Sequence, residues 1–212
     1  MAARFLDEAA RSAFTRAIEA VENASAAEVV VAVRRRSATY RHANAVAGVL
    51  VAFAGLATML YAAQPFQLSS ILVDPFVVGL LAAATVELMP QVKRWLSPLA
   101  MRRGHVQRAA RATFIERGVH NTTGRSGMLV YISWLERQVA LVVDSGLARA
   151  LPVGFVEGTE AELSRAMRAG GTEVARLVEA LAAPMAKAMP HRDDDVNELP
   201  DAIDSDLPRS RS

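Results

Sequence analysis

The sequence predicts an α/β fold, a small α/β/α sandwich that is interrupted by a two-helix transmembrane hairpin. Residues 44–63 carry no charged side chain, and residues 71–89 carry only Asp74 and Glu87, one near each end. A helix needs about 20 apolar residues to cross a bilayer, and both stretches are close to that length. Outside them, β-branched runs alternate with amphipathic stretches, which indicates one sheet covered by helices.

The charges beside the two apolar stretches predict which way the hairpin is inserted. The connecting loop, residues 64–70, contains no lysine or arginine, whereas both flanks are basic. Cytoplasmic flanks of membrane spans are enriched in basic residues, so we expect both termini and the soluble domain on the cytoplasmic side. The basic residues are Arg34, Arg35, Arg36 and Arg41 before the first span, and Lys93, Arg94, Arg102 and Arg103 after the second.

The chain before the hairpin predicts one helix and one strand. Residues 5–22 repeat apolar side chains at helical spacing, which is typical of an amphipathic helix that packs on a core. After a break at residues 23–26, residues 28–33 are almost continuously apolar and β-branched. Such a run predicts a strand that is covered on both faces. Residues 1–41 are therefore expected to form the first part of the α/β domain, and residues 42–92 the hairpin.

The chain after the hairpin predicts the rest of the same domain, residues 93–190. An amphipathic helix over residues 106–114 ends near Gly118, a residue type common after helix ends. The strands at 128–133 and 138–143 are separated by four residues, so they should pair as a β-hairpin. Two more helices are expected at about 159–169 and 172–185. Residues 191–212 contain seven acids and few apolar side chains, which predicts an acidic disordered tail.

Composition narrows the classes of function. The 212 residues include no cysteine, which excludes a thiolate metal site or a cysteine nucleophile. The four histidines show no metal-ligand spacing, and no glycine-rich loop suited to phosphate is present. Aromatic residues make up only 6% of the chain, which disfavours a nucleic-acid partner. A basic body on a membrane protein is more simply explained by topology and by attraction to anionic lipids.

The order and spacing of four segments resemble the TPM domain, in its membrane-anchored bacterial form. This resemblance implies an α/β/α sandwich and a membrane setting, here the bacterial inner (plasma) membrane. Plant thylakoid members of that family are linked to photosystem repair and acid phosphatase activity, and some bacterial members to calcium. The segments are residues 27–31, the run from Thr122 through Arg125-Ser126-Gly127 to Ser133, Glu136-Arg137 with Val139, and Asp144 with Gly146; residues 197–201 resemble the family's tail.

Asp144 is the candidate metal ligand, because it follows a strand and stands in a glycine-containing turn. A carboxylate in such a turn can bind calcium through oxygen ligands. It can equally form a local bond to the backbone that shapes the turn. Glu136 and Arg137 are expected to be a solvated pair of little energetic value. They should lie at the far end of the hairpin from Asp144, since six residues of strand span roughly 20 Å.

Two main functions remain open at this stage, beside a weaker third, a calcium-binding module centred on Asp144. The first is a non-catalytic adaptor or quality-control factor, with the lipid bilayer and other membrane proteins as partners. The alternative is a membrane-bound, metal-dependent phosphatase that binds calcium; no catalytic residue is assigned, and this alternative depends on the family resemblance. Small residues in the spans, Gly48, Gly55 and Gly79, offer faces for helix packing, so an oligomer is possible.

Overall fold

A computed structural model describes residues 5–191 and 203–207. The chain divides into two compact units, one formed by Met1–Ser37 with Arg103–Ser212 and the other by Ala38–Arg102. The predicted hairpin, residues 42–92, lies inside the second unit, which extends further at both ends. The first unit is the α/β domain, and it is built from two separate stretches of the chain.

Four strands form the sheet of the α/β domain, in the order β3-β2-β1-β4. They are β1 (Val29–Arg34), β2 (Met128–Ser133), β3 (Gln138–Val143) and β4 (Asp204–Ser205). β1 pairs in parallel with both β2 and β4, and β2 pairs antiparallel with β3. Parallel neighbours need a long crossover connection. In this chain the crossover from β1 to β2 contains the whole second unit.

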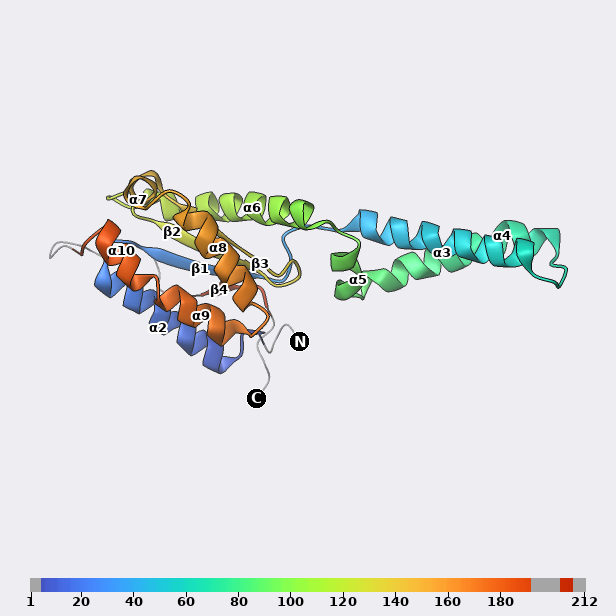
Figure 1. The fold of residues 1–212 in the computed structure, drawn as a ribbon, viewed down its shortest axis with the longest axis horizontal. Helices are drawn as coiled ribbons and strands as arrows, with labels where there is room; N and C mark the ends of the chain where they lie inside the picture. The colour runs from blue at the N-terminus through green and yellow to red at the C-terminus, as the bar shows by residue number, and fades with distance from the viewer. Residues whose placement is uncertain (1–4, 192–202, 208–212) are drawn as a thin grey trace. The chain divides into compact units, whose positions relative to one another are not determined.

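Four helices cover the face of the sheet that carries the larger apolar cluster. They are α2 (Glu8–Ala24), α8 (Phe155–Ala166), α9 (Gly171–Glu179) and α10 (Ala182–Ala188). α2 begins at Asp7, whose carboxylate accepts a hydrogen bond from the Ala10 N–H at 2.9 Å. Its apolar stripe, including Phe14 and Ile18, is fully buried against Val29, Val31 and Val33 of β1 and against α9. Figure 1 shows these helices on one side of the strands.

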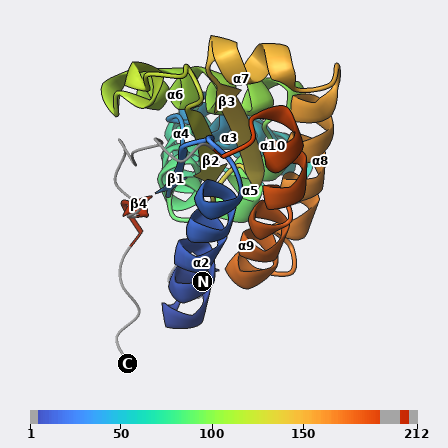
Figure 2. The ribbon, with the colours of Figure 1, turned by 90° about the vertical axis from the view of Figure 1, so that its left-hand side faces the viewer.

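The opposite face is covered by α6 (Leu99–Glu116). Val106, Ala110 and Phe114 of this helix form a second apolar cluster with the alternate strand residues, among them Val30 and Tyr131. The end-on view in Figure 2 shows the sheet between the two helical layers. The chain is therefore a mixed α/β protein with helices on both faces of its sheet, as predicted.

Two long apolar helices dominate the second unit, α3 (Arg41–Tyr61) and α4 (Leu68–Glu87), followed by the short α5 (Pro90–Trp95). α3 and α4 each have the length and apolar composition needed to cross a membrane, and most of their surface is exposed within the unit. They approach closely where two glycines meet. A Cβ atom at Gly79 would lie 2.6 Å from the carbonyl oxygen of Gly48, so only glycine permits this contact.

The tail differs from its prediction in one segment. Residues 191–212 were expected to be disordered, yet residues 203–207 lie along β1 and include β4. Residues 192–202 and 208–212 lie outside the described part of the chain. Main-chain pairing and the burial of Leu207, which is 5% exposed, account for the difference.

Candidate functional site

The structure places Asp144 directly after β3, where it is the N-cap of α7 (Ser145–Ala150). Its carboxylate accepts a hydrogen bond from the Ser145 N–H at 2.5 Å. Its own N–H donates to the carbonyl of Gly127 at 2.8 Å. The side chain is 7% exposed. Asp144 therefore forms the local bond to the backbone that was one of its two predicted roles. This bond stabilises the start of α7.

The second carboxylate oxygen of Asp144, Oδ2, has a different environment. It is buried and has no hydrogen-bond partner within the described residues. The Nη1 atom of Arg125 lies 3.8 Å away, close enough for an ion pair. The same Nη1 donates to the carbonyl of His120 at 3.3 Å. A buried carboxylate oxygen therefore faces an exposed arginine that can move away from it.

Two backbone carbonyls pack closely against Gly146, which follows Asp144 by two residues. A Cβ atom at Gly146 would be 2.6 Å from the carbonyl oxygens of both Gly124 and Arg125. Only glycine therefore fits at this position. Carboxylate and carbonyl oxygens are the ligands that calcium takes in proteins. Within the described residues, however, no group of three or more His, Cys, Asp or Glu side chains converges, so such an ion would take at most two side chains of these kinds from the described part of the chain.

Glu136 has a role that the sequence did not predict. The predicted solvated pair is wrong for this residue, because Glu136 is fully buried. Its Oε1 accepts from the backbone N–H of Ser37 at 3.0 Å, and its Oε2 from the hydroxyl of Ser133 at 2.5 Å. The hydroxyl of Ser37 also donates to Ser133 at 2.8 Å and lies 3.3 Å from the Tyr131 hydroxyl.

This buried network fixes the chain where it leaves the sheet. Ser37 follows β1 and is the last residue of the first segment of the α/β domain. Glu136 lies in the β2–β3 turn, at the opposite end of that hairpin from Asp144, as the strand length predicted. Burial raises the pKa of Tyr131, although the Ser37 hydrogen bond partly offsets this effect. Glu136 therefore fixes the backbone of Ser37, the point where the chain leaves the α/β domain for the apolar helices. It does not share a site with Asp144.

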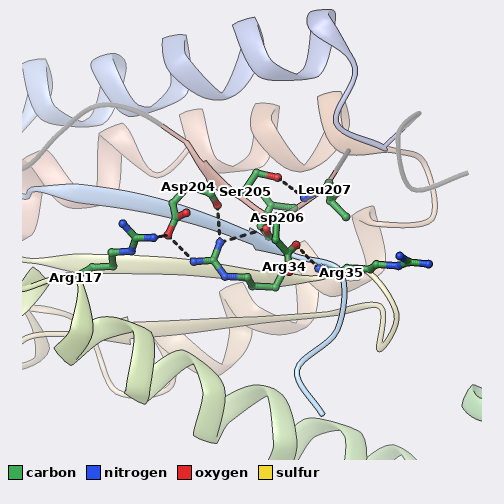
Figure 3. A network of polar contacts seen from close by, with 8 residues as sticks. Arg34, Arg35, Arg117, Asp204, Ser205, Asp206 and Leu207 are labelled. Carbon is green, nitrogen blue, oxygen red and sulfur yellow. Dashed lines mark hydrogen bonds and ion pairs between the residues drawn. The ribbon is translucent and has the colours of Figure 1, made fainter. Parts of the chain in front are cut away.

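A third set of polar contacts lies on the outer edge of β1 (Figure 3). Arg34 donates to the backbone carbonyl of Asp204 at 2.9 Å and to its carboxylate at 2.5 Å. Arg117, at the end of α6, contacts the same carboxylate oxygen at 2.5 Å. The backbone N–H of Arg35 donates to Asp206 at 2.6 Å. Burial lowers the pKa of Arg34, but the hydrogen bond and charge of Asp204 outweigh it, so the pKa is raised.

Sequence reasoning missed this edge because the tail's net acidity suggested disorder. A signal was present in the alternation of residues 203–207, which read Ile-Asp-Ser-Asp-Leu. Alternate apolar and polar residues are typical of a strand with one buried face. Leu207 joins the larger core and Ile203 packs against it, while Asp204 contacts the two arginines.

Neither the family models nor the curated proteins compared with this sequence gave a match. The fold is similar to the NMR structure of the BA42 protein from the psychrophilic bacterium Bizionia argentinensis. The TM-score is 0.56, and the alignment covers 95% of each chain at 15% sequence identity. At this identity the similarity concerns the fold alone.

Proposed function

We propose that this protein is a membrane-anchored adaptor or quality-control factor for other membrane proteins. In this proposal α3 and α4 span the bacterial inner membrane, and both termini and a TPM-like α/β domain lie in the cytoplasm. The observation that carries the proposal is the insertion of two apolar helices within the β1–β2 crossover of the α/β domain. An anchor placed there ties the domain to the membrane at two chain segments.

The surface of the two helices supports a lipid environment. Phe53 is 67% exposed, Phe76 68% and Leu80 72%. Soluble monomers rarely expose an apolar area of this extent. The ends of the helices are polar, as membrane interfaces allow: the Asn44 amide donates to Glu87 at 2.6 Å, and the Lys93 ammonium lies 2.7 Å from the same carboxylate.

In-membrane photo-crosslinking of the full-length chain, followed by affinity capture, tests the adaptor function. We expect a reproducible set of membrane proteins from cells that express the wild type. The matched control is a chain with Gly79→Leu, which should disturb the packing of the two helices and reduce the set. Capture of the same background proteins by both chains would contradict the proposal.

A calcium-binding phosphatase remains the second candidate, and the buried Oδ2 of Asp144 favours its calcium-binding part. Calcium that binds only the folded state raises the unfolding temperature in proportion to the logarithm of its concentration. We expect such a rise in the wild type and its loss in Asp144→Asn, which keeps an N-cap. Arg125→Asn should enlarge the rise, because it removes the competing cation. No rise in wild type or Arg125→Asn would remove this candidate.

A further inference from the structure

The two outer edges of the sheet are covered in different ways. On β3, the Val139 N–H donates to the Ser164 hydroxyl and the Leu141 N–H to Glu160, both at 2.8 Å. Ser164 and Glu160 belong to α8, so a helix of the domain protects this edge. On β1, the outer edge is covered by residues 203–207, from the far end of the chain. Uncovered edges are templates for pairing with another chain.

The segment that covers β1 is held by a few contacts of distinct kinds. β4 pairs in register with Ala32 and Val33, which are two of the six residues of β1. The Asp206 N–H donates to the Val33 carbonyl at 3.2 Å. Leu207 is the apolar anchor, and the acids contact Arg34, Arg117 and the backbone of Arg35. Figure 3 shows the acidic side chains directed toward the arginines.

Together these contacts form a site that recognises an extended segment with alternating apolar and acidic side chains. Main-chain pairing provides affinity that does not depend on sequence, and alternate side chains provide specificity. Here one face of the added strand requires apolar residues and the other requires carboxylates spaced by two. The cations come from different elements, β1 and the end of α6, so both elements must be in place for Asp204 to be recognised.

We propose that the outer edge of β1 is a binding site for an extended segment of a partner protein with the pattern apolar-acid-x-acid-apolar. Residues 203–207 are its resident intramolecular occupant. The inference deepens the proposed adaptor function, because it names the chemistry of the partner segment. Charge complementarity supports the choice of occupant. Asp204 of the resident segment contacts the guanidinium groups of Arg34 and Arg117, and Asp206 accepts from the backbone N–H of Arg35 while its charge also acts on Arg34.

Exchange between the resident segment and a partner is feasible on energetic grounds. The resident segment belongs to the same chain, so its pairing with β1 is intramolecular, with an effective concentration of the order of millimolar. Its intrinsic affinity is low, since the described strand has two paired positions and Arg117 is 51% exposed. A partner strand that pairs with more of β1 than these two positions gains further main-chain bonds and can displace it.

A peptide-binding experiment on the full-length protein in detergent tests this inference. The probe is a fluorescent peptide with the sequence of residues 201–208, measured by anisotropy. An opened variant, Asp204→Lys with Leu207→Asp, should release the resident segment and bind the peptide at least about tenfold more tightly than the wild type. Leu207→Ala should give an intermediate affinity, and Trp134 fluorescence verifies that each variant is folded.

Charge reversal tests the recognition itself. Arg117→Glu in a chain opened by Leu207→Asp alone, which keeps Asp204, should weaken binding about fivefold, as expected for an exposed charge pair. A peptide with lysine in place of Asp204 should bind that variant more tightly than it binds the chain with Leu207→Asp alone, where Arg34 and Arg117 both oppose the lysine. Equal binding to wild type and opened variant, or equal binding of a scrambled peptide, would overturn the inference. Failed peptide binding with successful partner capture would leave the adaptor proposal standing, whereas the reverse result would reject only the adaptor.

Discussion

Replacing Glu136 by alanine should destabilise the α/β domain strongly. The carboxylate accepts two hydrogen bonds, from the Ser37 N–H and the Ser133 hydroxyl, and it is fully buried. Hydrogen bonds to a charged group contribute about 1.5–3 kcal/mol each. Removing a buried charge recovers part of its desolvation cost. We therefore expect a loss of about 3 kcal/mol in the free energy of unfolding, or about 6–12 °C in Tm for a domain of this size.

The assay can report on this domain alone, because the protein has two tryptophans. In a Trp95→Phe background, the fluorescence of Trp134, next to the Glu136 turn, follows urea unfolding of the full-length chain in detergent. Glu136→Gln keeps an acceptor for Ser37 and should lose only about 1 kcal/mol. Glu162→Ala removes an exposed carboxylate from α8 and should change stability by less than about 0.5 kcal/mol. If Glu136→Ala changed the free energy of unfolding no more than Glu162→Ala does, the buried hydrogen bonds of Glu136 would not stabilise the domain as we infer.

Three further predictions concern other parts of the molecule. Burial raises the pKa of Glu160, so protonation of Glu160 stabilises the folded state. Glu160→Gln should therefore be more stable than the wild type at neutral pH. In urea titrations repeated at lower pH, this difference should disappear as the pH falls through the raised pKa. Gly79→Leu should destabilise the pair α3 and α4 by about 1–3 kcal/mol, because its Cβ would meet the Gly48 carbonyl. Gly55→Ala, whose Cβ would have its nearest contact at 3.9 Å, should not. Thermal unfolding followed by circular dichroism compares the two. Asp144→Ala should cost about 1 kcal/mol through loss of the α7 cap, in the same urea assay, and a cost equal to zero would contradict that role.

The elements that the sequence predicted share strong local patterns. The apolar run of β1, the paired runs of β2 and β3 and the stripe of α2 each show the period of their structure. The pairing of β2 with β3 follows from the four-residue turn between them. α8 begins earlier than its predicted start at residue 159, at Phe155. Glu160, inside this helix, accepts a hydrogen bond from the edge of β3.

The missed features depend on contacts between residues far apart in the sequence. Glu136 is buried because the backbone of Ser37, 99 residues away, supplies a donor. β4 forms against the edge of β1 and against Arg34, which lie about 170 residues before it in the sequence. A strand of two residues carries only a weak local signal, here the alternation of residues 203–207. Asp144 was located correctly at the end of β3, but its buried, unbonded oxygen follows from packing that the sequence does not display.

The proposed topology, in which α3 and α4 span a membrane with the α/β domain in the cytoplasm, can be tested directly. The absence of cysteine allows single-cysteine labelling in intact cells with a membrane-impermeant maleimide. We expect Phe66→Cys, in the loop between the helices, to be labelled from outside the inner membrane. Arg168→Cys, on the surface of the α/β domain, should react only after the membrane is broken. Labelling of Arg168→Cys in intact cells, with Phe66→Cys protected, would show that this topology is wrong.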